Sequence, residues 1–538
     1  MTAASHRRFV AMGAIAVVVT AALLSGAGAG ASAAAARATP EIPAGLAAAI
    51  HARFGAGAIR SSLAAPDTEG PLFGYSVAVS ADGTTALVGA PAAAHEAGAA
   101  YVFHVSDAGS WASSDAPTAA LTLPSHPVVV LGYAVALSTD GTTAFVAAPA
   151  AGSGSSDRPG VVYVFHVATE DAWTSSSTPT ATLAAAGSVN LGIGGLALSA
   201  DGTTLVAGAP FYNDPVGGAY VFHASSDAAW VTSSIPTAVL SAPSEASANC
   251  CVGSAVTISG DGTTALVSDF GNPDVDAADG GAFVYHVAAE DSWTSSASPA
   301  ARLSDAHDGV DYLGAGLALS GDGTAAFLAG LGAVDVFHAS DATEWASTST
   351  PTATLFASPV GFVAGPVAVS TDGTTALVTG FEAKRAAAFV FRVSAEDAWA
   401  SSSAPTATLI NSAEHTSSFP GEYGVLSGDG ATVLTGDPFL QANTGAADVF
   451  HAPDESSWVS SSTPTAILTD ATLARCVVPK LRRLTVSAAK SRLEGLNCRL
   501  GKVRRVHAKA AKGRVVSQSP KSGARLAVGT KVDVKVAK

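Results

Sequence analysis

Charged residues are scarce in this 538-residue chain, at 13% of the sequence, and there are only 2 methionines and 4 cysteines. Beyond the first 24 residues no stretch is both long and uncharged enough to cross a bilayer, which needs about 20 apolar residues, so we expect no membrane span. The sequence also lacks a nucleophile elbow and a paired-carboxylate motif. These absences predict a chain that is not an enzyme and needs no cofactor.

The N-terminus has the pattern of an export signal. A pair of arginines precedes an apolar run from Phe9 to Leu24, and Ala31-Ser32-Ala33 is a small-residue cleavage pattern. We therefore expect a signal peptide over residues 1–33, a linker over residues 34–58 and a secreted mature protein. No cysteine lies near the cleavage pattern, which argues against a lipoprotein anchor.

At seven places about one repeat apart, the dipeptide Asp-Gly lies between two alternating apolar stretches. In the first copy these are Ser76 to Ser80 and Thr85 to Val88. Two such stretches around Asp-Gly predict a β-hairpin, and we expect a type I′ turn. The aspartates are Asp82, Asp140, Asp201, Asp261, Asp322, Asp372 and Asp429.

Tryptophan follows the same repeat, because all seven tryptophans fall one per copy. Each lies six residues before a proline, as Trp111 does before Pro117. A large ring at one place in every repeat is typical of packing between repeats, and an aromatic groove for sugars is the alternative. The tryptophans are Trp111, Trp173, Trp230, Trp293, Trp345, Trp399 and Trp458.

A unit of about 60 residues with four strand-like runs, repeated seven times, is typical of a β-propeller. We therefore expect a mainly β protein with a seven-bladed β-propeller over residues 59–470. Two strands are candidates to complete the last blade, Thr465 to Leu468 and Ile59 to Ala65. In the first blade we expect strands at Tyr75 to Ser80, Thr84 to Gly89, Ala99 to Val105 and Thr118 to Leu123.

The first repeat also resembles a known family. Phe73-Gly74 followed by Gly89-Ala90-Pro91 is similar to the FG-GAP repeat of integrin α-chain propellers and bacterial surface proteins, and the likeness extends over roughly residues 60–470. The resemblance implies a propeller used for adhesion or ligand binding, and it does not imply an enzyme. Calcium loops of FG-GAP repeats have several Asp and Asn oxygens, whereas Ser80 to Thr85 offers one carboxylate, so we expect a turn without metal.

Two other groups of residues have a possible metal function. Asn272, Asp274, Asp276 and Asp279 alternate before Gly280, a spacing that suits calcium and also ordinary loops, so the sequence leaves this site open. Histidine ends the third strand in six repeats. The third strands of neighbouring blades lie too far apart to share zinc, and we expect these histidines to bond a nearby turn. They are His104, His166, His223, His286, His338 and His451, with Arg392 in the sixth repeat.

The connections between the second and third strands vary in length, whereas the spacing from the third strand to the tryptophan is constant. Loops on a rigid scaffold are where binding surfaces develop, so these connections form our candidate binding face. They are His95 to Ala97, Gly152 to Pro159, Tyr212 to Pro215, Asn272 to Asp279 and Glu382 to Arg385.

Residues 475–538 form a separate, basic domain. They contain 18 Lys and Arg against Glu494 and Asp533, a local net charge of +16 in a chain whose total is −15. We expect a helix at Val486 to Glu494 followed by three strands. The stretch Val515-Val-Ser-Gln-Ser-Pro-Lys-Ser-Gly523 resembles the PASTA domain of penicillin-binding proteins and bacterial receptor kinases. The resemblance implies a small α+β unit at the cell wall that sometimes binds muropeptides.

The four cysteines fall into two pairs. Export permits oxidation, and Cys476 and Cys498 bracket the expected helix, so we predict a disulfide between them. It would close a loop of about 20 residues and add ~3 kcal/mol to stability. Cys250 and Cys251 are adjacent, and a vicinal disulfide, two thiols and a link between chains all remain open.

Seven cations of the basic domain are candidates for binding peptidoglycan or another anionic wall polymer. Docking on the acidic propeller is the alternative. Nucleic acid fits the charge, but the expected secretion and the lack of interleaved aromatic residues argue against it. The candidates are Lys480, Arg482, Arg483, Arg499, Lys502, Arg504 and Arg505.

These features predict a secreted, non-catalytic binding or adhesion protein. The propeller loops would contact an unknown ligand or protein, and the PASTA-like domain would hold the molecule at the cell wall. The alternative is a secreted carbohydrate-active enzyme, a hydrolase or lyase, with two carboxylates about 5 to 10 Å apart at the propeller axis.

Overall fold

The computed structural model describes residues 71–538 apart from a set of gaps. The expected signal peptide, the linker and the candidate strand Ile59 to Ala65 lie outside the described residues. Within the described part, no helix is long and apolar enough to cross a membrane. The gaps are residues 94–96, 125–128, 150, 152–159, 186–189, 211–216, 244–251, 270–279, 306–312, 331, 357–360, 383–384, 411–422, 439–444, 471–474, 495–497, 509–511, 523 and 528–529.

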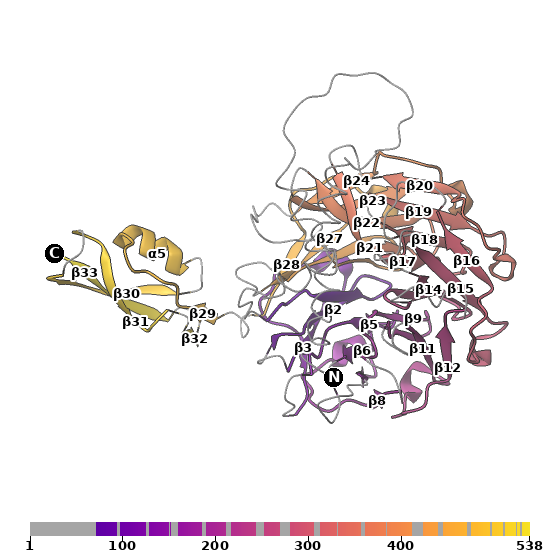
Figure 1. Ribbon diagram of the computed structural model, residues 1–538, viewed down its shortest axis with the longest axis horizontal. Helices are drawn as coiled ribbons and strands as arrows, with labels where there is room; N and C mark the ends of the chain where they lie inside the picture. Colours follow the sequence, from indigo (N-terminus) through magenta and orange to yellow (C-terminus); the bar gives the residue numbers. More distant parts are fainter. Residues whose placement is uncertain are drawn as a thin grey trace, which may run out of the picture.

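Strands β1 to β28 form seven four-stranded antiparallel sheets, and each sheet takes its strands in sequence order from one repeat (Figure 1). In the first blade the strands are β1 (Ser76–Val79), β2 (Thr85–Ala90), β3 (Ala99–His104) and β4 (Ala119–Leu121), within a residue or two of the prediction. Blades two to four comprise β5 (Val135–Leu137), β6 (Thr143–Ala148), β7 (Val161–His166), β8 (Ala181–Leu183), β9 (Leu196–Leu198), β10 (Thr204–Gly208), β11 (Gly218–His223), β12 (Ala238–Ser241), β13 (Val256–Ile258), β14 (Thr264–Asp269), β15 (Gly281–His286) and β16 (Ala301–Ser304). Blades five to seven comprise β17 (Gly316–Leu319), β18 (Ala325–Ala329), β19 (Ala333–His338), β20 (Ala353–Phe356), β21 (Gly361–Val369), β22 (Thr375–Glu382), β23 (Arg385–Arg392), β24 (Ala407–Ile410), β25 (Tyr423–Leu426), β26 (Thr432–Asp437), β27 (Ala446–His451) and β28 (Ala466–Leu468).

The sheets form a closed ring. The first strand of every blade contacts the first strand of the next, and β25 of blade seven contacts β1 of blade one. The last blade is completed by β28, whose Leu468 forms a parallel bridge with Ser114 of blade one. Each blade therefore uses only its own repeat, and of the two candidate closing strands the structure uses Thr465 to Leu468.

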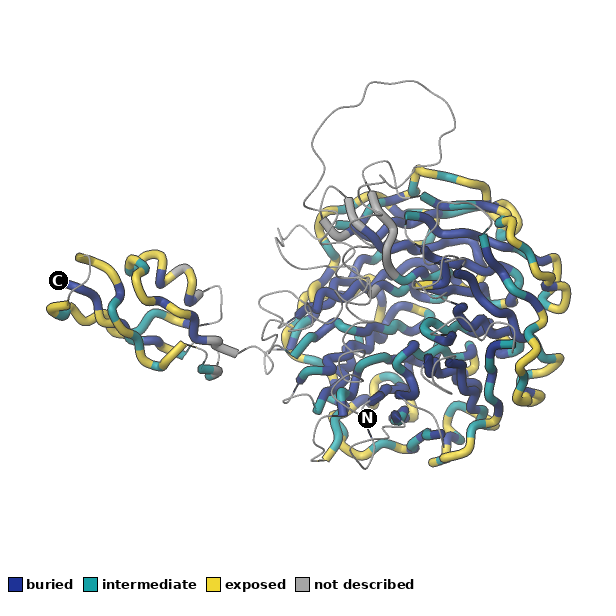
Figure 2. Tube along the Cα trace, in the orientation of Figure 1, coloured by how far each residue is buried: buried dark blue, intermediate teal, exposed yellow. Residues whose placement is uncertain are grey.

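The hydrophobic core lies mainly between neighbouring blades. The strands of the propeller are largely buried, whereas many connections at its rim are exposed (Figure 2). The cluster around Trp230, for example, combines Phe145 of blade two with Leu205 and Phe222 of blade three. The rings of Phe145 and Trp230 meet edge to face, with centroids 5.1 Å apart. All seven tryptophans are 3% to 8% exposed. The predicted packing role of tryptophan is confirmed.

The glycines of the FG-GAP motif lie where two blades approach closely. Gly74 has φ +87° and donates its N–H to the carbonyl of Gly89 at 3.0 Å. A Cβ on Gly89 would come within 2.2 Å of the carbonyl oxygen of Gly132 in blade two. Only glycine allows this approach, so the glycines of the motif let neighbouring blades pack closely.

The outer edge of each blade is covered by a loop of the next one. Ser176 of blade two donates its N–H to the carbonyl of Ala120 in blade one at 3.0 Å and accepts from the N–H of Thr122 at 3.0 Å. The hydroxyl of Ser175 accepts the N–H of Ala120 at 3.0 Å. Equivalent bridges join all seven pairs of blades. They satisfy groups that would otherwise leave seven exposed strand edges.

The C-terminal domain has its own core. Helix α5 (Val486–Glu494) has the predicted bounds and packs against β30 (Arg499–Val506). Strand β33 (Lys531–Ala537) lies between β30, to which it is parallel, and the antiparallel β31 (Val515–Ser519). A second sheet pairs β29 (Arg475–Val477) with β32 (Arg525–Ala527), two strands that the sequence did not predict.

Candidate functional sites

The Asp-Gly turns end the first strands of the propeller, and their geometry differs from the predicted type I′ turn. In blade one the N–H of Gly83 donates to the carbonyl of Ser80 at 3.0 Å, so Ala81 and Asp82 occupy the centre of the turn. Gly83 has φ +72°, whereas Asp82 is not among the residues with positive φ. This is a type I turn followed by a left-handed glycine, and the type I′ prediction is wrong.

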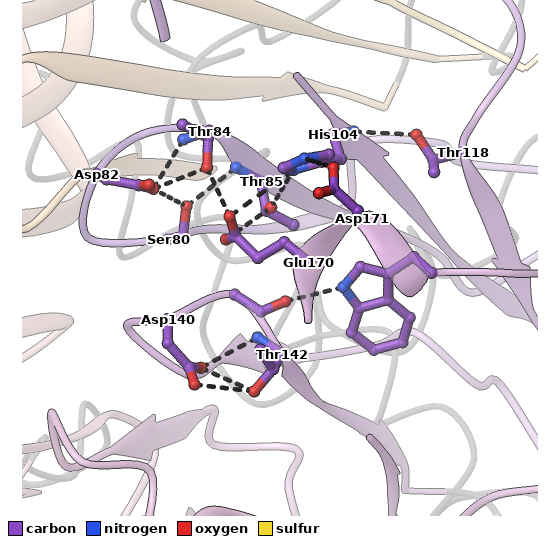
Figure 3. A network of polar contacts seen from close by, with 12 residues as sticks. Ser80, Asp82, Thr84, Thr85, His104, Thr118, Asp140, Thr142, Glu170 and Asp171 are labelled. Atoms are coloured by element: carbon purple, nitrogen blue, oxygen red, sulfur yellow. Dashed lines mark hydrogen bonds and ion pairs between the residues drawn. The ribbon is translucent and has the colours of Figure 1, made fainter. Parts of the chain in front are cut away.

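Each turn aspartate bonds its own turn. Asp82 accepts from the hydroxyl of Ser80 at 2.7 Å and from the N–H and hydroxyl of Thr84 at 3.1 and 2.9 Å (Figure 3). Burial opposes ionisation of Asp82, but these hydrogen bonds outweigh it and hold its pKa below the ordinary value. The carboxylate is therefore occupied by turn chemistry. Among the described residues no group of three or more His, Cys, Asp or Glu side chains could hold a metal ion.

The tryptophans also bond the turns. The indole N–H of Trp111 donates to the carbonyl of Gly83 at 2.8 Å. The same bond, at 2.8 to 3.0 Å, occurs in every blade. Each tryptophan thus ties the segment after the third strand to the turn between the first two.

A second layer of polar contacts joins neighbouring blades. Glu170 of blade two accepts from the hydroxyls of Thr84 and Thr85 of blade one at 3.0 and 2.9 Å (Figure 3). The ring of His104 bonds the Thr85 hydroxyl through Nδ1 at 2.8 Å and Asp171 through Nε2 at 3.1 Å. Four other predicted histidines make the same contact to threonine, and Arg392 instead donates to Glu455 at 2.7 Å. For these five histidines the predicted bond near a turn is confirmed.

The turns also bond one another around the propeller axis. Ala81 donates its N–H to the carbonyl of Thr139 in blade two at 2.9 Å, and Asp429 of blade seven donates to the carbonyl of Ala81 at 3.0 Å. Between blades two and three the link is the hydroxyl of Thr139, which donates to Ala200. The residue before each turn aspartate takes part in this ring of bonds: Ala81, Thr139, Ala200, Gly260, Gly321, Thr371 and Gly428.

Carboxyl pairs do occur, but between blades. Glu396 of blade six is hydrogen-bonded with Asp322 of blade five, and Glu290 of blade four with Asp201 of blade three. Burial and the nearby Asp322 carboxylate raise the pKa of Glu396. The alternative of a carbohydrate-active enzyme with an acid pair at the axis stays a hypothesis.

Several predicted features of the propeller lie outside the described residues. These are the calcium candidates Asn272, Asp274, Asp276 and Asp279, the cysteines Cys250 and Cys251, and most of the candidate binding loops. Of the loop residues, Ala97, Glu382 and Arg385 are described, and Glu382 at the end of β22 pairs with Arg385 at the start of β23. The loops leave from the ends of the second strands, at the opposite end of each blade from the Asp-Gly turns. The turn network described above is therefore not the face that the sequence indicated.

The structure separates the seven candidate cations of the C-terminal domain into two groups. Lys480, Arg482 and Arg483 precede α5 in a segment held against β31, where Gln518 accepts from the N–H of Leu481 at 2.8 Å. The other four lie on β30, on the far side of β33 from that segment. All seven are exposed: Lys480, Arg482, Arg483, Arg499, Lys502, Arg504 and Arg505.

Two further cations join the β30 group. The register pairs Arg499 with Lys531 and Arg504 with Lys535, so each pair lies on one face of the sheet. Lys531 and Lys535 are not among the candidates predicted from the sequence, because the parallel pairing of β30 and β33 connects strands separated by β31 and β32. Their alternation with the valines of β33 is the sequence pattern that could have placed both lysines on one exposed face.

The state of the cysteines is only partly described. Cys498 is 2% exposed within the domain core and is disulfide-bonded. Cys476 lies in β29, and its side chain is outside the described residues. The pairing of Cys476 with Cys498 stays a prediction.

Comparison with known proteins agrees with this organisation. Residues 60–103 match the FG-GAP repeat and residues 477–538 match the PASTA domain. No curated protein matches the chain in sequence. Three similar solved structures are the Pseudomonas aeruginosa periplasmic gluconolactonase (18% identity, TM-score 0.42, covering 69% of this chain and 94% of that one), the Kuenenia stuttgartiensis hydrazine synthase (14%, 0.38, 59% and 83%) and the Swd1 β-propeller domain of Myceliophteria thermophila (9%, 0.40, 67% and 91%).

At such TM-scores none of these three likenesses bears on activity. The family matches and the seven four-stranded sheets agree on architecture. The chain folds as a seven-bladed β-propeller whose first repeat matches the FG-GAP repeat, and it ends in a domain that matches the PASTA domain.

Proposed function

We propose that this is a secreted, non-catalytic binding protein whose PASTA domain attaches to anionic polymers of the cell wall and whose propeller presents loops to a ligand. The observation that carries the proposal is the separation of charge: residues 475–538 have a net charge of +16, and the remainder of the chain is acidic. Opposite charges in two domains of one chain favour different partners for the two.

The hydrogen bonds of the polar side chains in the described propeller support a structural, non-catalytic role for them. The polar side chains of the turn face bond turns and blade seams, as Asp82 and Glu170 do. Five turn aspartates have a lowered pKa because hydrogen bonds outweigh burial, and such carboxylates are ionised at neutral pH rather than poised as general acids. These are Asp82, Asp140, Asp201, Asp322 and Asp372.

Export is part of the proposal. The apolar run from Phe9 to Leu24 and the Ala31-Ser32-Ala33 pattern support it, together with the FG-GAP and PASTA matches, which are typical of extracellular proteins. The proposed disulfide between Cys476 and Cys498 fits an oxidising compartment. Mass spectrometry of the secreted chain under non-reducing digestion would show whether these two cysteines are joined.

Wall attachment can be tested by co-sedimentation of the purified mature chain with cell-wall sacculi across a salt series, beside a version that ends at Ala474. The shorter version keeps every strand of the propeller, which closes its ring with β28. We expect only the full-length chain to sediment and salt to release it. Equal sedimentation of both versions, or of neither, would contradict attachment through the PASTA domain.

A further inference from the structure

The three-stranded sheet of the PASTA domain has two faces of different chemistry. On one face Val532, Val534 and Val536 are buried in the core with residues of α5. Residues alternate along a strand, so Lys531 and Lys535 lie on the other face, where both are exposed. Helix α5 therefore leaves this second face, which we call the open face, uncovered by its own packing.

Cations from β30 join the lysines on the open face. Arg499 is in register with Lys531, and Arg504 with Lys535. Neighbouring strands lie about 4.8 Å apart, so each arginine stands beside a lysine across the strands. Like charges directly opposite one another destabilise a sheet. Two such pairs on one face are expected where an anion lies over them.

The remaining residues of the open face leave the cations available. Asp533, the acid between the two lysines, accepts the N–H of Lys502 at 2.6 Å and lies against Gly501. Ser517 and Ser519 of β31 are in register with Lys535 and Asp533 and add hydroxyl groups to the same face. The open face is thus polar and basic across three strands.

The spacing indicates an elongated ligand. Lys531 and Lys535 are four residues apart on one strand, which places the two Arg–Lys pairs about 13 Å apart. A single small anion would engage one pair. A planar carboxylate is satisfied by one arginine fork, whereas a tetrahedral phosphate can present oxygens to an arginine and a lysine from different strands.

We propose that the open face of the β30–β33–β31 sheet is a binding site for a linear phosphate-bearing wall polymer, with Arg499 and Lys531 holding one phosphate group and Arg504 and Lys535 another. This inference deepens the proposed wall attachment and rests on it for its biological setting. Lys531 and Lys535 are not among the seven cations predicted from the sequence.

The test uses the full mature chain and fluorescently labelled inorganic polyphosphate, with labelled polyglutamate of similar length as the carboxylate comparison. We expect tighter binding of polyphosphate, and a plot of log affinity against log salt with a slope of about −3 for four engaged cations. The double variant R504Q/K535Q should lose at least about tenfold in affinity and about one unit of slope for each cation removed.

The matched control is K490Q/R492Q, which removes the same charge from exposed positions on α5, the element that covers the other face. Its affinity should stay within about twofold of the parent chain. If both double variants lose the same affinity, the domain responds only to net charge and the open-face site is wrong. Equal binding of polyglutamate, or no binding of polyphosphate, would also overturn it.

A sedimentation arm separates this inference from the proposed function. Sacculi are used intact and after removal of their phosphate polymers. Binding that survives this removal unchanged would contradict the phosphate site and leave wall attachment standing. Failure to bind either preparation would contradict wall attachment. The polyphosphate titration would still test phosphate binding at the open face by itself.

Discussion

Each of the seven tryptophans fills the space between two blades and donates its indole N–H to a turn carbonyl. The two contacts explain why the residue stands at one spacing in every repeat. The ring supplies apolar area to the seam, and the N–H satisfies a carbonyl that the hairpin itself leaves unbonded. Phenylalanine would supply most of the apolar area but could not donate the hydrogen bond.

Replacing Trp230 with phenylalanine therefore has a defined cost. The change removes the bond to the carbonyl of Gly202, 3.0 Å away, and leaves a small cavity against Phe145. We expect the free energy of unfolding to fall by about 2 to 3 kcal/mol, measured by urea denaturation. V231A, at a neighbouring side chain that is 71% exposed, should change it by less than about 0.5 kcal/mol. Equal effects of the two variants would contradict the packing role.

Glu396 is a residue whose replacement should stabilise the protein. Burial and Asp322 raise its pKa, so folding becomes less favourable as the pH rises above the ordinary value of 4.5. E396Q removes this ionisation, and we expect a gain of up to about 1 kcal/mol at pH 7 that shrinks toward pH 4. E170Q is the comparison, because Glu170 holds the same place in blade two and accepts from the hydroxyls of Thr84 and Thr85. A gain for E396Q that does not change with pH would contradict this explanation.

At the scale of the element, the outer strands are stabilised by a loop from another blade. The outer strands comprise only three or four residues and would be weak edges by themselves. Two hydroxyl residues after each tryptophan supply the missing partner, as Ser175 and Ser176 do for Ala120. They are two serines in five blades, Thr232 and Ser233 in blade three, and Ser347 and Thr348 in blade five. The serines and threonines at these positions therefore have a structural function.

The S175A variant tests this function. It leaves the N–H of Ala120 without its side-chain acceptor, and we expect a loss of about 0.5 to 1.5 kcal/mol in the free energy of unfolding. S177A, two positions along the same loop and also exposed, is the matched control and should be close to neutral. Thermal unfolding followed by circular dichroism compares the two. A neutral S175A would show that water replaces the serine without cost.

At the scale of the whole molecule, the ring must join its last blade to its first without exchanging a strand. Besides the bridge between Leu468 and Ser114, Tyr101 of blade one is hydrogen-bonded with Asp470, just after β28. Burial and this carboxylate raise the pKa of Tyr101. This closing contact joins blade one to the end of blade seven, between residues that are far apart in sequence.

The Y101F variant removes this closing contact. It takes a hydrogen bond from Asp470, which is 3% exposed, and we expect a loss of about 1 to 3 kcal/mol in the free energy of unfolding. Y163F is the control, since Tyr163 occupies the same place in blade two and its pKa is raised by burial alone. Hydrogen exchange should localise the loss to blades one and seven. A loss spread evenly over the ring would contradict a role in closure.

Much of this architecture was accessible from the sequence, because the signals are local. The Asp-Gly turns, the tryptophan spacing and the alternation of apolar residues predict the strands of each blade, and α5 has the expected bounds. The turn type was not predictable in the same way, since Asp-Gly fits two geometries. The bond from Gly83 to Ser80 decides between them, and it depends on the path of the flanking strands.

The sequence by itself determined the repeat, the number of blades and the division of charge between two domains, because these depend on residues close together in the chain. Tertiary structure alone decided which strand closes the ring, which serines cover which strand edge and which cations share one face of the PASTA sheet. Those contacts join positions such as Ser114 and Leu468, or Arg499 and Lys531, that no local pattern connects. Their pairing depends on the register and packing of the complete fold.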